Sequence, residues 1–254
     1  RTELDKIDPS IIILGEGWAG GGTLLSASEQ SLKKNIYKFE NLQIAAFSDD
    51  IRDGLKGSVF GDTDTGFVSG KLGQEERVKS GVIAATKYTG IKWADTYTDI
   101  CSPWAASPIQ TINYVSAHDN FTLYDKLLMS VETEKEETVA AVAKYGKGTP
   151  NEAFERKENI AEIYKMAAGI YFTSAGIPFF QAGEEFLRTK YGEDDSYKSS
   201  ADINKLDWKR AYENKDIVEY YASLIKMRKE HKELFHLSDN GAATVEFKVV
   251  EEPK

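Results

Sequence analysis

The sequence predicts an α/β fold with a parallel sheet of four strands. Along its 254 residues, short apolar runs alternate four times with segments of helical spacing, and long stretches follow the apolar runs. Acidic residues or histidine stand after three of the four runs. Parallel α/β folds carry their functional side chains at the carboxyl ends of strands, so the same observations predict where a site lies.

Two strand–helix pairs are expected in the first part of the chain. Ile11–Gly15 is apolar up to its last residue, which is typical of a strand buried on both faces, and Glu29–Phe39 follows as a helix. The second pair joins a short apolar strand, Gln43–Phe47, to a helix over Gly73–Thr89 whose apolar residues recur at helical spacing.

Two longer pairs are expected in the second part. Thr111–Ser116 is predicted to be a strand, and Ala153–Ser174 a helix with apolar residues at intervals of three and four. Ile177–Gln181 is the fourth predicted strand, and Asp216–His231 the last helix. The Glu- and Lys-rich stretch Glu132–Glu158 is interpreted as a solvated helix and loop.

Four such units are half of a TIM (β/α)₈ barrel, which needs about 250 residues for all eight. Residues 1–236 are therefore predicted to form a partial barrel with long substrate loops after its strands. Residues 237–254 are predicted to start a carboxyl-terminal β domain, because Thr244–Val250 alternates polar and apolar residues. Half a barrel leaves open edges, so we expect stability only with the missing half or through self-association.

Composition limits the partners. The net charge of -9 argues against a nucleic-acid partner, and no apolar stretch approaches the ~20 residues of a membrane span. Cys101 is the only cysteine, so no intrachain disulfide can form, as suits a reducing compartment or a large secreted enzyme. The chain begins with Arg1 and no signal peptide, which suggests a cut end. No cofactor or metal is expected, although calcium, which needs no short ligand spacing, stays open.

Side chains suited to sugar chemistry follow the predicted strands. Glu16 and Trp18 follow the first, His118 and Asp119 the third, and Glu184 with Glu185 the fourth. Glycoside hydrolysis uses paired carboxylates, one to protonate the leaving oxygen and one to attack or to activate water. Histidine can bond sugar hydroxyls, and an aromatic ring can stack on a pyranose. A strand-end Glu in a glycine turn and a structural or metal-binding His–Asp pair are the alternatives.

Several strings carry a more specific pattern, namely Gly15–Trp18, Phe47–Gly57, Tyr114–Asn120, Gly183–Lys190, Asp195–Tyr197 and Asp202–Asn204. Together they resemble the type I pullulanases, starch-debranching members of the α-amylase superfamily (glycoside hydrolase family thirteen). Gly15–Trp18 resembles the segment with the general acid, and Tyr114–Asn120 the segment with a His–Asp pair. The others resemble stretches particular to pullulanases, although Asp195 replaces the usual Asn.

The resemblance implies catalytic roles for three residues. Glu16 would be the general acid and then the general base. Asp119 would hold two sugar hydroxyls and stabilise the oxocarbenium-like transition state, and His118 would donate to a hydroxyl of the same sugar. Substrate contacts are implied for a further set: Trp18, which would stack near the leaving-side subsites, Asn120, Tyr197, Asp202 and Asn204. Arg52, Asp53 and Arg188 are interpreted as loop-fixing ion pairs.

The resemblance also implies an incomplete site. Family members are retaining enzymes and need a nucleophilic Asp, about 5–5.5 Å from the acid, in an Arg-x-Asp string that this sequence lacks. We therefore expect the carboxyl-terminal half of a catalytic barrel that is inactive alone, from an enzyme that cleaves α-1,6 bonds in pullulan, amylopectin or glycogen. The alternatives are an isoamylase- or neopullulanase-like α-glucan hydrolase, a transglycosylase, or a non-catalytic glucan-binding half-domain. Among bacterial locations, the extracellular space or cell surface is favoured over the cytoplasm.

Overall fold

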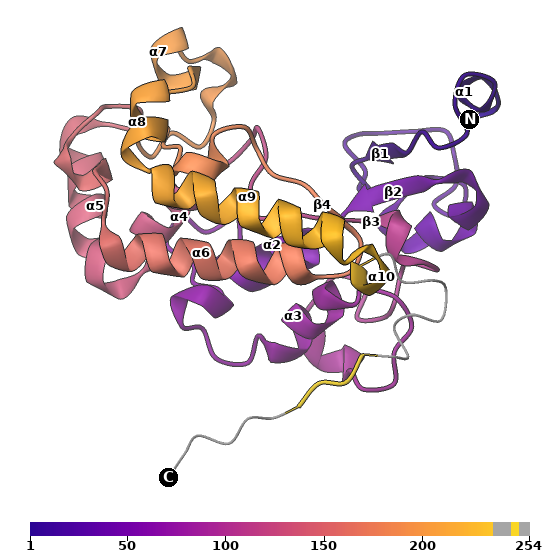
Figure 1. The fold of residues 1–254 in the computed structure, drawn as a ribbon. Helices are drawn as coiled ribbons and strands as arrows, with labels where there is room; N and C mark the ends of the chain where they lie inside the picture. The colour runs from indigo at the N-terminus through magenta and orange to yellow at the C-terminus, as the bar shows by residue number, and fades with distance from the viewer. Residues whose placement is uncertain (236–244, 249–254) are drawn as a thin grey trace.

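The computed structural model describes residues 1–235 and 245–248. Its four strands form one parallel sheet in sequence order, drawn as arrows in Figure 1: β1 (Ile13–Gly15), β2 (Ile44–Phe47), β3 (Thr111–Asn113) and β4 (Ile177–Pro178). Each strand lies inside its predicted range, which confirms the parallel α/β class. Strands β1 and β2 begin later than predicted, and β3 and β4 end earlier, so the loops that follow β3 and β4 at the carboxyl edge are longer still.

The register of the sheet aligns the carboxyl ends of the strands. Gly15 pairs with Ala46, Phe47 with Ile112, and Asn113 with Pro178. The residue that follows each strand therefore emerges on the same edge of the sheet.

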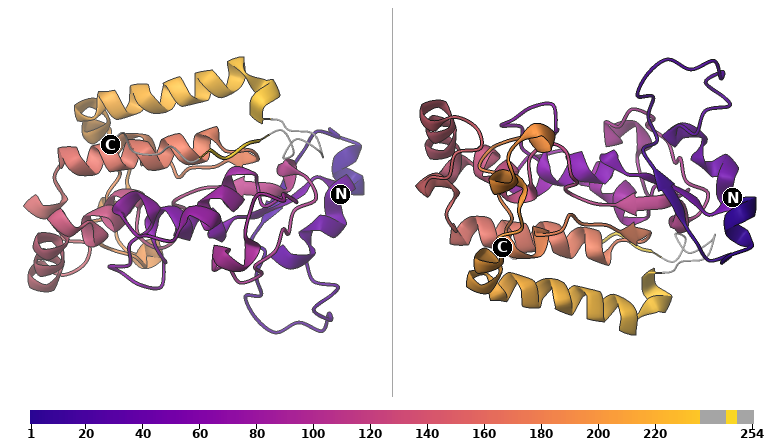
Figure 2. Two further views of the ribbon diagram at one scale, coloured as in Figure 1. Left: turned by 90° about the horizontal axis from the view of Figure 1, so that it is seen from below. Right: turned by 90° about the horizontal axis from the view of Figure 1, so that it is seen from above.

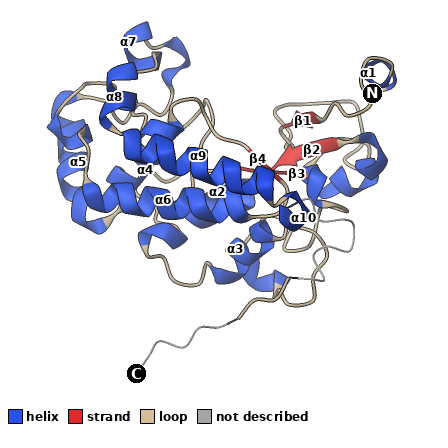
Figure 3. Ribbon diagram, viewed as in Figure 1, coloured by secondary structure: helices blue, strands red, loops and turns tan. Residues whose placement is uncertain are grey.

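Most of the helices, among them α6 and α9, lie on one side of the strands, to the left in Figure 3, whereas α1 lies on the other side. The α-helices are α1 (Thr2–Asp5), α2 (Asp49–Lys56), α3 (Glu75–Val82), α4 (Leu123–Ser130), α5 (Glu132–Tyr145), α6 (Glu158–Thr173), α7 (Ala201–Asn204), α8 (Trp208–Glu213), α9 (Lys215–Glu230) and α10 (Lys232–Phe235). Short 3₁₀ helices are η1 (Lys33–Leu42), η2 (Phe67–Ser69), η3 (Trp93–Thr96), η4 (Pro108–Gln110), η5 (Glu152–Phe154), η6 (Glu184–Phe186) and η7 (Ser196–Lys198). The long helices α6 and α9 and the solvated helix α5 are confirmed.

Two predicted helices are wrong in kind or length. Residues 29–32 are not helical, and a 3₁₀ helix begins only at Lys33. The Gln30 carbonyl, which an α-helix would bond to the N–H of Lys34, accepts instead from the side-chain amide of Asn35 at 2.8 Å. The helix predicted to reach Thr89 ends at Val82. Ala84 and Ala85 take left-handed φ values of 56° and 52°, where the Ala84 carbonyl accepts from the Thr111 hydroxyl at 2.7 Å.

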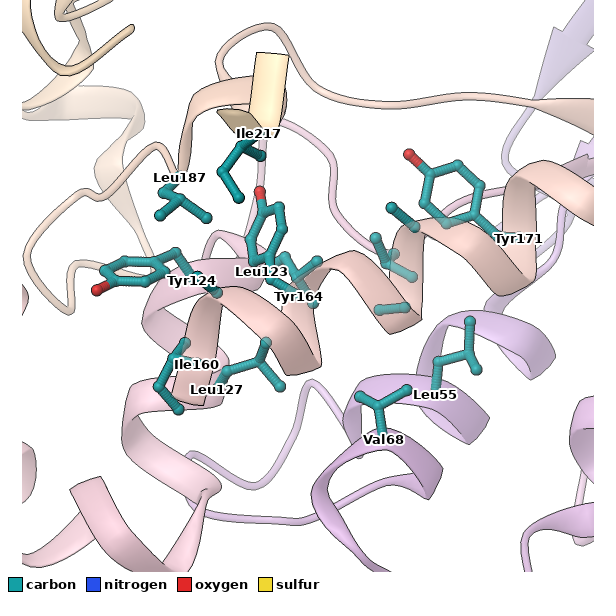
Figure 4. Packing of buried hydrophobic residues seen from close by; sticks show 14 of the residues in the cluster. Leu55, Val68, Leu123, Tyr124, Leu127, Ile160, Tyr164, Tyr171, Leu187 and Ile217 are labelled. Carbon is teal, nitrogen blue, oxygen red and sulfur yellow. The ribbon is translucent and has the colours of Figure 1, made fainter. Parts of the chain in front are cut away.

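The main core lies between the helices α2, α4, α6 and α9 (Figure 4). Helix α6 lies beside α9 in both views of Figure 2, and its buried Tyr164 and Tyr171 pack with Ile217 and Tyr221 of α9. Apolar side chains of α4, including Leu127, complete the cluster. This core fixes the helical layer against which the strand ends are held.

Strand β1 is an edge strand, and the prediction that it is buried on both faces is wrong. It pairs only with β2 in the described part of the chain. Ile12 and Leu14 are consequently 37% and 46% exposed. An open, apolar edge is what a partial barrel was expected to present.

The carboxyl-terminal residues 245–248 contain no strand. Val245 and Phe247 pack against Ile83 and Ile91, and the Val245 carbonyl accepts from the hydroxyl of Tyr88 at 2.6 Å. The rest of the strand predicted over 244–250, and the domain boundary at 237, lie outside the described residues. No helix in the two described ranges is long and apolar enough to cross a membrane.

The buried face of α4 gives the first prediction. Leu127 is fully buried, so Leu127→Ala removes core contacts and leaves a cavity, and we expect a loss of about 2–5 kcal/mol in the free energy of unfolding. Leu24→Ala is the control, because the Leu24 side chain is fully exposed. Urea unfolding followed by circular dichroism measures both. Equal stability of the two variants would contradict the central place of α4 in the core.

Candidate active site

An open pocket lies at the carboxyl ends of all four strands, with about 400 Å³ of space that includes open solvent. Its lining comes from the strand ends and the loops that follow them: Glu16, Trp18, Phe47, Arg52, Tyr114, Ala117, His118, Asp119 and Phe179. The structure therefore brings together the four side chains that the sequence singled out after the first and third strands. Their chemical roles stay predictions.

Three aromatic rings from neighbouring strand ends form a wall of the pocket. The ring of Phe47 meets those of Tyr114 and Phe179 edge-to-face, with centroids 5.0 and 5.2 Å apart. Such contacts fix ring orientation as well as burying apolar surface. The pocket thus has a firm apolar side on which a sugar ring can rest.

Arg52 supplies a buried cation to the same pocket. Its Nε lies 2.6 Å from the Asp53 carboxylate, and its Nη1 donates to the Tyr114 hydroxyl at 2.8 Å. Burial disfavours the charged guanidinium, but the hydrogen bond and charge of Asp53 outweigh it, so the pKa of Arg52 is raised. The predicted loop-fixing pair of Arg52 and Asp53 is confirmed. That Arg52 also lines the pocket was not predicted from the sequence.

A buried ion-pair network fixes the base of the loop that carries Glu16. The Gly17 carbonyl accepts from the backbone N–H of Lys33 at 2.5 Å. Lys33 Nζ in turn lies 2.5 Å from Asp49 and 2.9 Å from Asp50, whose other oxygen accepts from Trp104 Nε1 at 2.9 Å. Burial lowers the pKa of Lys33, yet the two carboxylates outweigh it and raise the pKa. Residues 18–29 are all exposed and form the outer part of this loop.

Gly17 is required by the closeness of this contact. A Cβ at position 17 would lie 2.9 Å from the Lys33 nitrogen and 3.1 Å from the Ala46 Cβ. The glycine therefore lets the chain turn between Glu16 and Trp18 while it stays bonded to Lys33.

The acidic and imidazole groups of the pocket face solvent. Glu16, His118 and Asp119 are exposed, and Trp18 is 40% exposed. Within the described ranges, no hydrogen bond from the protein engages the side chains of Glu16, His118 or Asp119. These groups are therefore free to bond a ligand that enters the pocket.

Asn120 does not line the pocket. It has a left-handed φ of 58°, a conformation that asparagine tolerates, and it leads into α4 two residues before the helix cap Thr122. Its role as a substrate contact stays a prediction.

The other predicted substrate contacts lie away from the pocket. Tyr197 is 73% exposed, and Asp202 lines a separate small pocket with Arg188. The side-chain amide of Asn204 donates to the Ser196 carbonyl at 2.8 Å, and the Asn204 carbonyl accepts from Arg188 at 2.6 Å. The predicted ion pair of Arg188 is wrong, because its guanidinium binds main-chain carbonyls and no carboxylate within 4 Å in the described chain.

Glu184 was grouped with the rim carboxylates, but the structure buries it. Its side chain is 2% exposed and accepts from the hydroxyls of Ser116, Tyr171 and Tyr221. Burial raises the pKa of Glu184 to about 7, although the three hydroxyls and Lys56 act in the opposite direction. Burial lowers the pKa of Lys56 to about 7. This pair was not expected from the sequence.

A metal site is absent from the residues that the structure describes. No group of three or more His, Cys, Asp or Glu side chains lies close enough together to hold an ion.

Comparison with known proteins identifies relatives of one kind. No protein-family model matches the chain. The pullulanase of Bacillus subtilis (strain 168) is 31% identical over 231 residues, which are 91% of this chain and 27% of that protein. Pullulanase 1, chloroplastic, of Arabidopsis thaliana is 30% identical over 84% of this chain and 23% of its own length. The chain thus spans about a quarter of the length of these relatives.

Solved structures agree with the sequence relatives. The pullulanase of Paenibacillus barengoltzii in complex with maltohexaose and alpha-cyclodextrin matches with a TM-score of 0.78 and 35% identity, over 99% of this chain and 34% of that one. The pullulanase from Bacillus acidopullulyticus matches with a TM-score of 0.72 and 32% identity, over 95% and 25%. The similarity therefore covers the fold and the pocket together.

The Lys33 network gives the second prediction. Lys33→Met leaves Asp49 and Asp50 without their cation in a buried place, which we expect to destabilise the fold by about 3–5 kcal/mol. Limited proteolysis should then cut residues 18–29 faster, because the base of their loop is released. Lys34→Met is the control, since Lys34 is exposed. An equal response of both variants would rule out this role of Lys33.

The burial of Glu184 gives the third prediction. Its pKa is about 7 in the fold and 4.5 ordinarily, so the folded state binds the additional proton between these pH values. Its contribution, about 3 kcal/mol, is complete below pH 4.5 and is lost as the pH rises through 7. Thermal melts from pH 4.5 to 7 should show this decline in the native chain and in Glu213→Gln, whose carboxylate is exposed. Glu184→Gln should lack it, and a decline of the same size there would contradict the assignment.

Proposed function

We propose that this chain, which belongs to the pullulanase family, is part of a retaining glycoside hydrolase that cleaves α-1,6-glucosidic bonds in pullulan and branched α-glucans. One observation carries the proposal: Glu16, Trp18, His118 and Asp119 line one pocket at the carboxyl ends of parallel strands. The solved relatives include pullulanases in complex with maltohexaose, maltotetraose and maltotriose. Those complexes support an α-glucan as the substrate class.

In this proposal, each pocket residue acts on one part of the glycosidic bond. Glu16 gives its proton to the leaving oxygen and then takes a proton from the attacking water. Asp119 accepts hydrogen bonds from sugar hydroxyls, and its charge stabilises the oxocarbenium-like transition state. His118 donates to a hydroxyl of the same sugar, and Trp18 stacks on the leaving side. Exposure of all four side chains suits a polymeric substrate that approaches from solvent.

The nucleophile of a retaining enzyme is proposed to come from outside this chain. The sequence holds no Arg-x-Asp string, and the chain covers 34% of the Paenibacillus pullulanase. The strands follow one another in the sheet without reversal, as in a barrel segment. The open edges at β1 and β4 are where further strands would pair, so the chain alone is proposed to need that complement, or self-association, and to hydrolyse nothing.

The fourth prediction concerns turnover. The protein expressed from the whole open reading frame that encodes this chain should release maltotriose from pullulan. Glu16→Gln should lower the rate by at least 10²-fold, because the substituted amide cannot give up a proton to the leaving oxygen. The purified chain of residues 1–254 should release none. High-performance anion-exchange chromatography measures the product.

Controls separate the parts of this proposal. Glu75→Gln, at an exposed position on α3, should leave the rate unchanged. Panose instead of maltotriose would point to 1,4-cleavage of the neopullulanase type. Release of maltotriose by the purified chain alone would overturn the proposal that the nucleophile lies outside this chain. Absence of turnover by a folded whole protein would overturn the proposal that it is a debranching enzyme.

A non-catalytic role of the isolated chain has one observation in its favour. Trp18 is 40% exposed at the pocket and presents an aromatic surface to solvent. Weak glucan binding would retard the chain in starch-containing native gels, and Trp18→Ala would restore its mobility. Unchanged mobility of the native chain would exclude this role.

A further inference from the structure

A hydrogen-bonded cluster around Glu184 lies in the core beside the pocket. The Glu184 carboxylate accepts from the Ser116 hydroxyl, from Tyr171 of α6 at 2.7 Å and from Tyr221 of α9 at 2.9 Å. Its main-chain carbonyl accepts from the Tyr164 hydroxyl at 2.6 Å. One carboxylate thus joins the loops that follow β3 and β4 to both long helices. Figure 4 shows where Tyr164 and Tyr171 lie on α6.

Ser116 connects this cluster to the pocket. It is 1% exposed and stands directly before Ala117, His118 and Asp119, all of which line the pocket. The loop leaves the core at Ser116, so the bond from its hydroxyl to Glu184 fixes the point from which His118 and Asp119 project.

A carboxylate is a costly way to fill this space. Burying a charged carboxylate costs free energy because the group loses its contacts with water. An apolar side chain of similar volume would pack here without that cost. Glu184 instead offers acceptors to three hydroxyls that would otherwise be buried without partners. The Glu184 cluster therefore fixes the positions of the side chains that bond to it more than it stabilises the fold.

We propose that Glu184 is a positioning residue that holds Ser116 in place and thereby sets where His118 and Asp119 stand in the pocket. This inference rests on the proposed function, because it takes the loop after β3 to be part of the catalytic site. Glu184 itself lies outside the pocket and touches no substrate.

The groups that face Glu184 determine how it responds to pH. Lys56 of α2 is buried nearby, and burial raises the pKa of Glu184 and lowers that of Lys56, each to about 7. Burial also raises the pKa values of Tyr164, Tyr171 and Tyr221 well above 10, so these tyrosines stay neutral donors. Protonation of Glu184 converts one acceptor oxygen into a donor, and the cluster must then rearrange near neutral pH.

The fifth prediction tests this link by nuclear magnetic resonance on the protein expressed from the whole open reading frame. Ser116→Ala and Glu184→Gln should shift the same backbone amide signals of residues 117–120, and the double variant should shift them no further than either single one. Ser116→Thr should keep the native signals, because it keeps the hydroxyl. A titration of these amides near pH 7 should disappear in Glu184→Gln.

Several outcomes would overturn the proposal. They are native signals at 117–120 in Ser116→Ala, additive shifts in the double variant, or a titration near pH 7 that persists in Glu184→Gln. Ser116→Ala carries the test if Glu184→Gln does not fold, since it removes one hydroxyl only.

A second arm uses the same protein in a turnover assay. There, Ser116→Ala should lower kcat about tenfold with little change in KM, because it removes one charge-assisted bond that orients the loop. Shifted amides without any native turnover of pullulan would leave the positioning role in place and reject the proposed function. Native kcat in a variant with shifted amides would reject the positioning role alone.

Discussion

The backbone ladder between β1 and β2 is the contact on which the candidate site depends. Glu16 follows an edge strand, and in the described residues that strand is held on one side only, through the pairing of Ile13 with Ile44 and of Gly15 with Ala46. Three paired residues are a short ladder, and the bond from Lys33 to Gly17 strengthens it just beyond its end. The position of Glu16 relative to Asp119 is thus set by main-chain geometry and one buried cation.

Much of the fold could be predicted because the information was local. An apolar run of four or five residues indicates a strand, even where, as in β1, the strand is not buried on both faces, and parallel strands in sequence order must present their carboxyl ends together. Those two facts place Glu16 and Asp119 on one edge without any knowledge of the loops between them. The family resemblance added roles to these positions, and the comparisons support the same family.

Other parts could not be predicted because they depend on distant partners. All eight residues of α4 are buried, Asp125 and Lys126 among them, so the helix has no side exposed to solvent and its polar residues do not mark a surface. Helix α2 buries the charged residues Asp50, Arg52 and Lys56. Burial of Asp50 and Arg52 is compensated by hydrogen bonds to partners far along the chain, Trp104 and Tyr114. The burial of Glu184 could not be predicted for the same reason. The residues next to it in the sequence do not determine whether a carboxylate after a strand faces the pocket or the core.

The close approach at Gly17 changes how mutational sensitivity should be interpreted near this site. Any side chain there would collide with the backbone of Lys33 or with Ala46 and would displace the residues on both sides, Glu16 and Trp18. In a substitution scan, position 17 would look as intolerant as a residue that transfers protons, although it contributes no functional group. Intolerance at this edge of the sheet therefore measures steric room as much as chemistry.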